Sequence, residues 1–438
     1  MKKIKYLSSV SILPLLLFSC ASSLSKEGKW IKYSVMSYIT ASDYSTVKPF
    51  AADMTLRYFI SDSIKNPDSF EETLTSTFEK DVKYYHYIFD RHHYYYNNEE
   101  KTSYYTSLKT INDSYGTNKE VVCPKELYDL LKEGVRYTEL TSGYFSFFSG
   151  RLVDFWDEIL TECSDNVPYT LLDPLFNEEN NKLLKRLVYT TPTVEEAKHL
   201  LTFNDEKCSV IFNTLENIYY NDELLERDSA SSLYRPLITA GAIAKGYATK
   251  LIQDDLISKN YTSGFLNSGS SSISHLSKPN YTKKNYQEVT FADPRNLYVR
   301  VGAFTFNIYD KVNLSTSGNY SSKSYEMNID GQKIRRHHII NPYSGEPEQL
   351  HESITLVSKS FDAGQLDAFS TALLSQSEQD ILAFRKKVLN EFPSFDLDII
   401  ILDLDSDKET LLIKSTSTFS SSLKIVEDCA KAKVIYFE

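Results

Sequence analysis

The sequence predicts a mixed α+β fold in one large domain. Segments with helical periodicity alternate with strand-like segments to the end of the chain, and no low-complexity linker or repeat divides them. The chain has 438 residues, of which 41% are hydrophobic, and its 32 Tyr and 24 Phe can build a substantial core. This composition excludes an intrinsically disordered protein. Interleaved helices and strands fit an α/β or an α+β arrangement.

The N-terminus predicts an export signal. Lysines within the first five residues precede an apolar run over 12–18. That run is much shorter than the roughly 20 residues that a membrane span needs, so it is typical of a cleavable signal. Cys20 follows directly on the small residue Ser19, as in a bacterial lipobox. The alternative is a buried cysteine in an ordinary helix.

These features divide the chain into three parts. We expect a signal peptide over 1–19, a lipidated Cys20 with a small and polar tether over 20–30, and one domain over 31–438. The domain is then held by lipid alone on the outer face of the cell membrane.

Charge and cysteine spacing exclude two further classes. The chain has 48 Lys and Arg against 59 Asp and Glu, a net charge of −11, which argues against nonspecific nucleic-acid binding. An anionic ligand would need local help from a metal ion, helix N-termini or particular lysines. No CxxC pair is present, so a zinc site is not expected. The cysteines beyond Cys20 are expected to be core residues; they are Cys123, Cys163, Cys208 and Cys429.

Periodicity predicts the main elements in chain order. Amphipathic helices are expected over 50–90 and 124–160, and a helix followed by a strand over 195–220. A strand-like segment covers 263–272. Towards the C-terminus we expect a helix around 364–375, another near 377–392, and a buried strand over 398–405.

A helix start at Gly241 and Ala242 is the first candidate binding feature. Small residues let a ligand approach the backbone, and the amides at a helix N-terminus favour phosphate. Lys245, one turn in, adds positive charge. The alternative is a tight packing turn in which Lys245 is only solvated.

Asp367, Ser370 and Thr371 form the second feature. On a helix they lie at i, i+3 and i+4, on one face. A carboxylate with hydroxyl oxygens suits Mg²⁺ that completes its shell with water and substrate phosphate. The alternative is that Asp367 caps or solvates a helix start.

A hydroxyl-rich segment and a histidine pair form the third feature. Residues 315–318 (STSG) offer several hydroxyls on a flexible backbone, and His337 and His338 precede a strand and an Asn-Pro…Gly turn. A histidine is well suited to take a proton from a hydroxyl near neutral pH. The alternative is a hairpin with histidines packed beside it. The aromatic cluster over 86–94 is expected to be a packed or ligand-stacking helix face, and not a metal site.

Taken in order, these segments resemble the ApbE family of FAD:protein FMN transferases, also described as flavin-trafficking lipoproteins. The resemblance covers roughly residues 31 to 430, and its specificity lies in the ordered set of motifs. The motifs are FDRHHYYYNN (89–98), KTIN (109–112), SGYFSFFSGRLVDFW (142–156), TAGAIAKGYA (239–248), FLNSGSSS (265–272), LSTSGNY (314–320), HHIINPYSGEP (337–347) and LDAFSTAL (366–373).

The resemblance implies a T-fold-related architecture, FAD as substrate, Mg²⁺ at its diphosphate, and transfer of FMN to a Thr or Ser hydroxyl of an exported partner protein with release of AMP. It implies that Ala242 (through its carbonyl), Asp367 and Thr371 bind the metal, with Ser370 nearby, and that Asp367 and His338 act in catalysis, His338 as the base. The residues implied to bind the cofactor are Tyr144, Phe145, Ser146, Thr239, Lys245, Thr316, Ser317 and Ile340.

Some positions depart from the family pattern. Thr239 stands where the family usually has Asp, Ser146 where it often has Asp or Asn, and Ser270 and Ser271 where it has a second Gly and an Asp. Fewer polar contacts could weaken FAD binding or change the nucleotide preference. Two other functions therefore stay open, a flavin-binding or trafficking lipoprotein without transferase activity and an FAD pyrophosphatase.

Overall fold

A nine-stranded sheet forms the centre of the computed structural model, which describes residues 28–276, 286–307, 311–319, 324–407, 409–426 and 431–437. In order across the sheet, its strands are β1 (Gly28–Val35), β4 (Met54–Ser61), β10 (Gly264–Ser268), β11 (Ser272–His275), β14 (Asn313–Gly318), β17 (Ser353–Ser358), β18 (Asp398–Leu404), β19 (Leu411–Thr416) and β21 (Ala432–Phe437). Neighbouring strands are antiparallel, except that β21 pairs parallel to β19.

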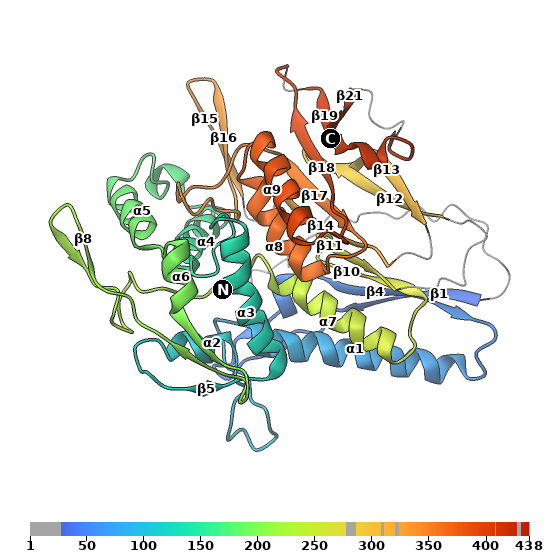
Figure 1. Ribbon diagram of the computed structural model, residues 1–438, viewed down its shortest axis with the longest axis horizontal. Coiled ribbons are helices and arrows are strands. Elements are labelled where there is room, and N and C mark those ends of the chain that lie inside the picture. Colours follow the sequence, from blue (N-terminus) through green and yellow to red (C-terminus); the bar gives the residue numbers. More distant parts are fainter. Residues whose placement is uncertain are drawn as a thin grey trace, which may run out of the picture.

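Helices cover one face of this sheet. α1 (Pro67–Phe89) packs on β4, α7 (Ala244–Ser258) on β10 and β11, and α8 (Ala363–Leu374) on β14 and β17. Figure 1 shows α1 and α7 running across the front of the sheet. Side chains alternate along β18, so that Ile399 and Ile401 join the core under the helices while Ile400 and Leu402 face away.

The opposite face of the sheet packs on a smaller sheet of β12 (Tyr286–Asp293), β13 (Asn296–Asn307) and β20 (Lys424–Ile425). Phe291 and Phe304 from this small sheet form a second core with Leu314 and Ile400 of the large one. The protein therefore has three layers, and both faces of its central strands are buried.

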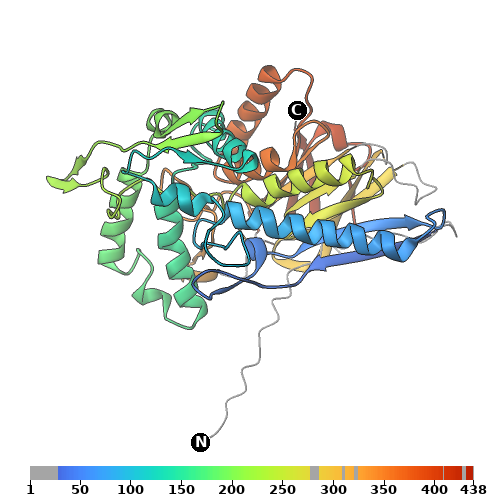
Figure 2. The same ribbon diagram turned by 90° about the horizontal axis from the view of Figure 1, so that it is seen from below.

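The remaining helices gather at one end of the sheet, beside α7 and α8 (Figures 1 and 2). They are α2 (Leu108–Asp113), α3 (Lys125–Leu140), α4 (Gly150–Ser164), α5 (Glu178–Thr190) and α6 (Val194–Leu200), and α9 (Glu378–Glu391) follows α8. The short strands are β2 (Ile39–Thr40), β3 (Thr46–Val47), β5 (Val121–Val122), β6 (Leu201–Asn204), β7 (Ser209–Phe212), β8 (Ile218–Tyr220), β9 (Glu223–Leu225), β15 (Tyr325–Ile329) and β16 (Gln332–Arg336). One contiguous core joins α3 to α1, α7 and α8, so the predicted single mixed domain is confirmed.

Several predicted elements need correction. The helix expected over 50–90 begins only at Pro67, because residues 54–61 pair with β1 and β10 and form β4. The helix expected over 124–160 is two helices, α3 and α4, separated by turns over 141–149. By contrast, α8, α9 and β18 lie where periodicity predicts them.

Two site segments also differ from expectation. Residues 315–318 are not flexible, because they belong to β14 in the middle of the large sheet. The histidine pair directly follows β16, and the next strand, β17, begins only at Ser353; between them lies an isolated bridge of Ile340 with Pro347.

The described residues carry no helix with both the length and the apolar character that a bilayer crossing requires. The predicted signal peptide, Cys20 and the start of the tether lie outside the described residues, as does Cys429. Cys123 is a buried free thiol, as expected of a core residue, whereas the free thiols of Cys163 and Cys208 are only half-buried.

Candidate functional site

The site is built where α7 crosses α8. Gly246 makes this crossing possible: a Cβ atom there would lie 2.2 Å from the carbonyl oxygen of Ala363 and 2.6 Å from the Cβ of Asp367. Only a residue without a side chain therefore lets the two helices approach so closely. The contact brings the N-terminal turn of α7 against the part of α8 between Ala363 and Asp367.

We expect Gly246→Ala to destabilise the protein by about 1–3 kcal/mol, although alanine normally favours a helix over glycine. The added methyl group must push α7 away from the backbone of α8. Gly241→Ala is the matched control, since a Cβ there would meet only the Thr239 hydroxyl, at 3.8 Å. Chemical denaturation of both variants checks this. Equal stability of the two would contradict the close packing.

Asp367 lies at the helix crossing and is 4% exposed. Its Oδ2 accepts a hydrogen bond from the Gly246 N–H at 3.0 Å, and its Oδ1 accepts one from the Ser315 hydroxyl at 3.3 Å. Burial raises the pKa of the Asp367 carboxyl, while Lys245 and these two donors counteract part of the effect. The Asp367 carboxylate thus accepts a hydrogen bond from a main-chain amide at the start of α7, and its burial disfavours the charged form.

Hydroxyl groups surround this carboxylate. Ser317 Oγ lies 2.8 Å from Ser370 Oγ and 3.2 Å from Thr371 Oγ1. Ser370 and Thr371 also donate to the main-chain carbonyl of Asp367, at 3.1 and 3.0 Å. The predicted i, i+3, i+4 set therefore does lie on one face of a helix, and β14 adds two more hydroxyls to it.

Alternation along β14 decides which hydroxyls reach the site. Ser315 and Ser317 point to α8, whereas Thr316 is on the other side of the strand and shares a hydrogen bond of 2.9 Å with Thr355. Thr316, predicted to bind the cofactor, is therefore turned away from Asp367. Ser315 belongs to the hydroxyl-rich 315–318 segment but is not among the residues implied to bind the cofactor or the metal, and the period of two in a strand is the signal that identifies it.

The start of α7 is later than predicted. The helix begins at Ala244, because residues 241–243 form turns and Ile243 has φ −141° and ψ −31°. Ala242 lies half-buried in this turn, four residues before Gly246. Lys245 is half-buried beside the Ser268–Ser271 turn, since a Cβ on Gly269 would lie 3.7 Å from its Cδ.

The two histidines have different environments. His337 is fully buried: its Nδ1 accepts the Ile339 N–H at 3.2 Å, so Nε2 carries the proton and donates to the Glu348 carbonyl at 2.6 Å. His338 reaches solvent, and no hydrogen bond ties its ring to another residue that the structure describes. The protein around it, helped by His337 and Lys245, lowers the pKa of His338 to about 3.

Lys245 connects the two halves of the site. Its charge lowers the pKa of both the Asp367 carboxyl and the His338 imidazole, so it lies within electrostatic reach of each. Lys245 therefore influences the charge of both the Asp367 carboxyl and the His338 imidazole.

The 142–149 segment lies beside the chain that leads into α7. Its backbone pairs with that of 237–239, where the Thr239 N–H donates to the Phe147 carbonyl at 2.9 Å. Tyr144 is half-buried against Tyr343, with ring centroids 5.1 Å apart, and Ser146 is half-buried as well. Phe145, also predicted to bind the cofactor, is 2% exposed and belongs to the main core.

The loop that carries His338 ends in a tight turn. Gly345 has φ +72°, and a Cβ there would lie 2.3 Å from Val188, so glycine is required for both reasons. Ile340, predicted to bind the cofactor, is half-buried in this loop and packs on the core around Trp156.

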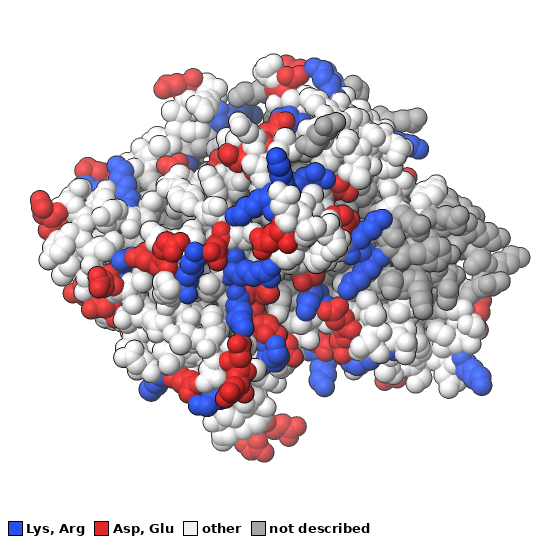
Figure 3. All heavy atoms as spheres, in the orientation of Figure 1, with Lys and Arg blue, Asp and Glu red and all other residues white. Residues whose placement is uncertain are grey.

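The arrangement is chemically suited to a hard cation and an anionic ligand. Within the described residues no three His, Cys, Asp or Glu side chains gather as a metal site. One buried carboxylate with several hydroxyl oxygens matches the oxygen ligands of Mg²⁺. On the face shown in Figure 3, acidic and basic side chains are interspersed and form no continuous basic patch, as the net charge predicts.

Known proteins share this sequence pattern and this fold. The profile of the ApbE family matches residues 74–393. The ApbE protein from Thermotoga maritima is similar, with 21% identity and a TM-score of 0.53, covering 85% of this chain and 94% of that one.

Two further solved structures have a similar fold. The flavin transferase ApbE from Vibrio cholerae has 13% identity and a TM-score of 0.55, over 90% of this chain and 99% of its own. The flavinyl transferase ApbE from Pseudomonas stutzeri, in its apo form, has 14% identity and a TM-score of 0.55, over 90% and 96% of the two chains. No curated protein matches this chain.

Proposed function

Because this chain belongs to the ApbE family, we propose that it transfers the FMN half of FAD to a Thr or Ser hydroxyl of an exported partner protein. The observation that carries the proposal is the buried Asp367 carboxylate at the crossing of α7 and α8, bonded to the Gly246 N–H and the Ser315 hydroxyl and surrounded by further hydroxyls of β14 and α8. In this proposal Asp367 serves the diphosphate side of the nucleotide and His338 serves the acceptor hydroxyl.

In the proposed reaction the acceptor oxygen forms a bond to the phosphorus of the FMN half. The bond between that phosphorus and the bridging oxygen breaks, and AMP leaves with the electron pair. His338 takes the proton of the acceptor hydroxyl, for which its exposed position and its freedom from other hydrogen bonds are suited. Lys245, half-buried at the start of α7, attracts the negative charge of the diphosphate.

The residues present fit a magnesium ion. Asp367, Ser370, Thr371 and the carbonyl of Ala242 would hold it, because a buried carboxylate with hydroxyl and carbonyl oxygens provides the oxygen ligands that Mg²⁺ prefers. Bound there, the ion would neutralise charge on the diphosphate and on the leaving phosphate.

The test is an incubation of purified protein with FAD, MgCl₂ and a soluble test protein that carries an Asp-x-x-Thr-Gly-Ala-Thr segment, the acceptor motif that the family resemblance implies. A fluorescent test protein on a denaturing gel, together with AMP, supports the transferase. The same test protein with Val in place of both Thr residues of this segment should stay unlabelled.

The other outcomes point to the alternatives. AMP without a labelled protein identifies an FAD pyrophosphatase. Tightly bound FAD without AMP identifies a flavin-binding or trafficking protein, a function that Thr239 and Ser146 favour because each replaces a residue with more capacity for polar contact. Absence of both FAD binding and AMP would overturn the proposed flavin chemistry altogether.

We also propose that Cys20 is lipidated and holds the domain on the outer face of the cell membrane. The support is the order of lysines, apolar run, small residue and cysteine, followed by polar residues up to the first strand at Gly28. In a bacterial host given labelled palmitate, we expect Cys20→Ser to abolish labelling, whereas Cys123→Ser should keep it. Labelled Cys20→Ser protein would refute the anchor.

A further inference from the structure

Arg336 is a buried cation two residues before His338. It is 1% exposed, and its partner Asp173 is fully buried. Arg336 Nε donates to Asp173 Oδ2 at 2.8 Å, and Nη2 donates to Oδ1 at 3.3 Å. The bidentate geometry fixes the guanidinium plane as well as its position.

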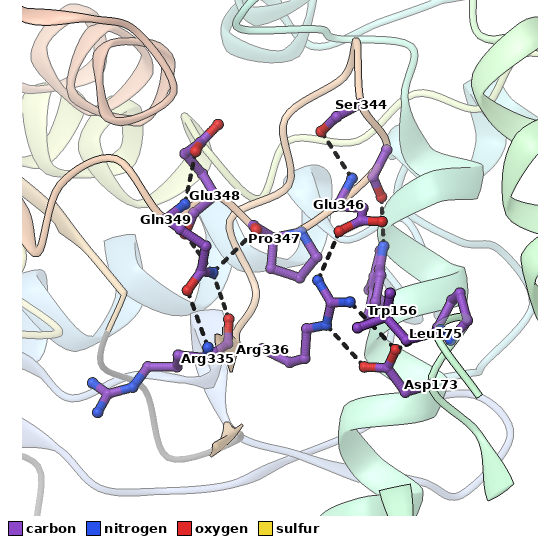
Figure 4. Close-up of polar contacts among 12 residues, drawn as sticks. Trp156, Asp173, Leu175, Arg335, Arg336, Ser344, Glu346, Pro347, Glu348 and Gln349 are labelled. Atoms are coloured by element: carbon purple, nitrogen blue, oxygen red, sulfur yellow. Dashed lines mark hydrogen bonds and ion pairs between the residues drawn. The ribbon is translucent and has the colours of Figure 1, made fainter. Parts of the chain in front are cut away.

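Further groups contact both members of this ion pair. Asp173 also accepts the Tyr325 hydroxyl at 2.7 Å and the Leu175 N–H at 2.9 Å. The guanidinium carbon lies 5.1 Å from the centre of the Trp156 ring of α4, at a distance typical of a cation–π contact. Figure 4 shows Arg336 pointing between Asp173 and Glu346, with Trp156 alongside.

The same groups also hold the far end of the loop. Arg336 Nη1 donates to Glu346 Oε2 at 2.9 Å, and Trp156 Nε1 donates to the Gly345 carbonyl at 2.6 Å. Arg336, just before the loop over 337–346, is thus bonded to Glu346 at the end of the loop. Trp156 contacts the Arg336 guanidinium and also bonds the Gly345 carbonyl. We name Arg336, Asp173, Trp156 and Glu346 the loop clamp.

Inside the loop, the neighbours of His338 are fixed too. The His337 ring bonds the Glu348 carbonyl and the Ile339 N–H, and Ile339 is 6% exposed in the main core. His338 thus has an anchored backbone and a side chain that no hydrogen bond restrains among the described residues. A buried ion pair gives little net stability by itself, because the lost hydration opposes the attraction between the charges.

We propose, on the basis of the proposed function, that the loop clamp is a positioning device for His338. It holds the imidazole at the site so that the acceptor proton is taken in the correct geometry, and it does not itself touch substrate. Displacing a reacting group by about 1 Å can cost roughly 100-fold in rate, which makes such a device effective.

Glu346→Ala tests the proposal. Glu346 has a side chain that is 43% exposed, so its removal opens one end of the clamp without leaving a buried charge of its own, whereas loss of Arg336 would leave Asp173 buried and unpaired. We expect kcat for transfer to the Thr test protein to fall about 10- to 100-fold, with KM for FAD within about threefold of wild type. Glu346→Gln keeps an acceptor oxygen and should recover most of kcat.

Glu326→Ala is the matched control. Glu326 pairs with Arg335 on the same hairpin and is also 43% exposed, but it does not contact the 337–346 loop through that pair. Hydrogen–deuterium exchange of the unliganded proteins should show faster exchange over 337–346 in Glu346→Ala only.

The outcomes separate two failures. If the wild-type protein labels no test protein, the proposed function is wrong, and exchange alone then decides whether the loop clamp exists. If the wild type is active and Glu346→Ala keeps its kcat, or loses no more than Glu326→Ala, the positioning role is overturned while the proposed function stands. Equal loop exchange in both variants also overturns the clamp.

Discussion

Asp367→Asn is expected to lower flavin transfer by about 1,000-fold or more while leaving the protein at least as stable as the wild type. Asparagine has nearly the same shape and can still accept the Gly246 N–H, which the wild-type carboxylate accepts at 3.0 Å. What it lacks is the charge that would bind a cation beside the diphosphate. Removal of one metal-binding charge costs several kcal/mol of transition-state stabilisation.

The stability part of this prediction follows from the pKa. Burial raises the pKa of the Asp367 carboxyl, so the folded protein disfavours its charged form. Above the pKa of the unfolded chain, near 3.8, the carboxylate therefore destabilises the fold, and below it the group is neutral in both states. Asp367→Asn should then raise Tm or leave it unchanged at pH 7, with no gain below about pH 3.8.

Asp362→Asn is the matched control. Asp362 lies on the same helix as its N-cap, accepts the Gln365 N–H at 2.9 Å, and has a carboxyl whose pKa burial also raises. Asparagine caps helices as well as aspartate does, so this variant should keep both fold and transfer. Transfer assays and thermal melts of both variants decide. Activity of Asp367→Asn within tenfold of wild type would remove the metal role of Asp367.

The sequence could predict the local part of this site and not its assembly. Helical spacing was sufficient to place Asp367, Ser370 and Thr371 on one face. The contact between Asp367 and Gly246 spans 121 residues, and that between Arg336 and Asp173 spans 163, so neither follows from periodicity. Such pairings depend on how the elements pack.

The errors have similar causes. The strand β4 falls within the helix expected over 50–90. Its residues Met54, Leu56, Tyr58 and Ile60 are buried and stand at every second position, which is a strand signal. The strong helical pattern of α1, which follows after a short turn, outweighs that signal. Thr316 is among the residues implied to bind the cofactor and Ser315 is not, because a segment expected to have a flexible backbone gives no indication of which side chains share one face. The family pattern located the right segments, and the strand register is needed to choose residues within them.

His338→Ala is expected to lower kcat for transfer by about 100- to 1,000-fold, while the affinity for FAD changes by less than about threefold. The imidazole is exposed and bonds no described residue, so its removal leaves no partner unsatisfied. His199→Ala is the control, since His199 is an exposed histidine on α6. FAD titration and single-turnover labelling measure the two quantities. A loss of affinity as large as the loss of rate would make His338 a ligand contact only.

The pH dependence of transfer gives a second, sharper test of His338. The surrounding protein lowers the pKa of His338, and a weaker base accepts protons poorly, so the unliganded protein is not yet prepared for the reaction. The diphosphate of bound FAD is negative, and a negative neighbour raises the pKa of an imidazole. Because kcat/KM reports the free enzyme and kcat the complex, the acid limb of kcat should lie at higher pH than that of kcat/KM, and neither limb should remain in His338→Ala. Coincident limbs in the wild-type protein would show that FAD does not activate this histidine.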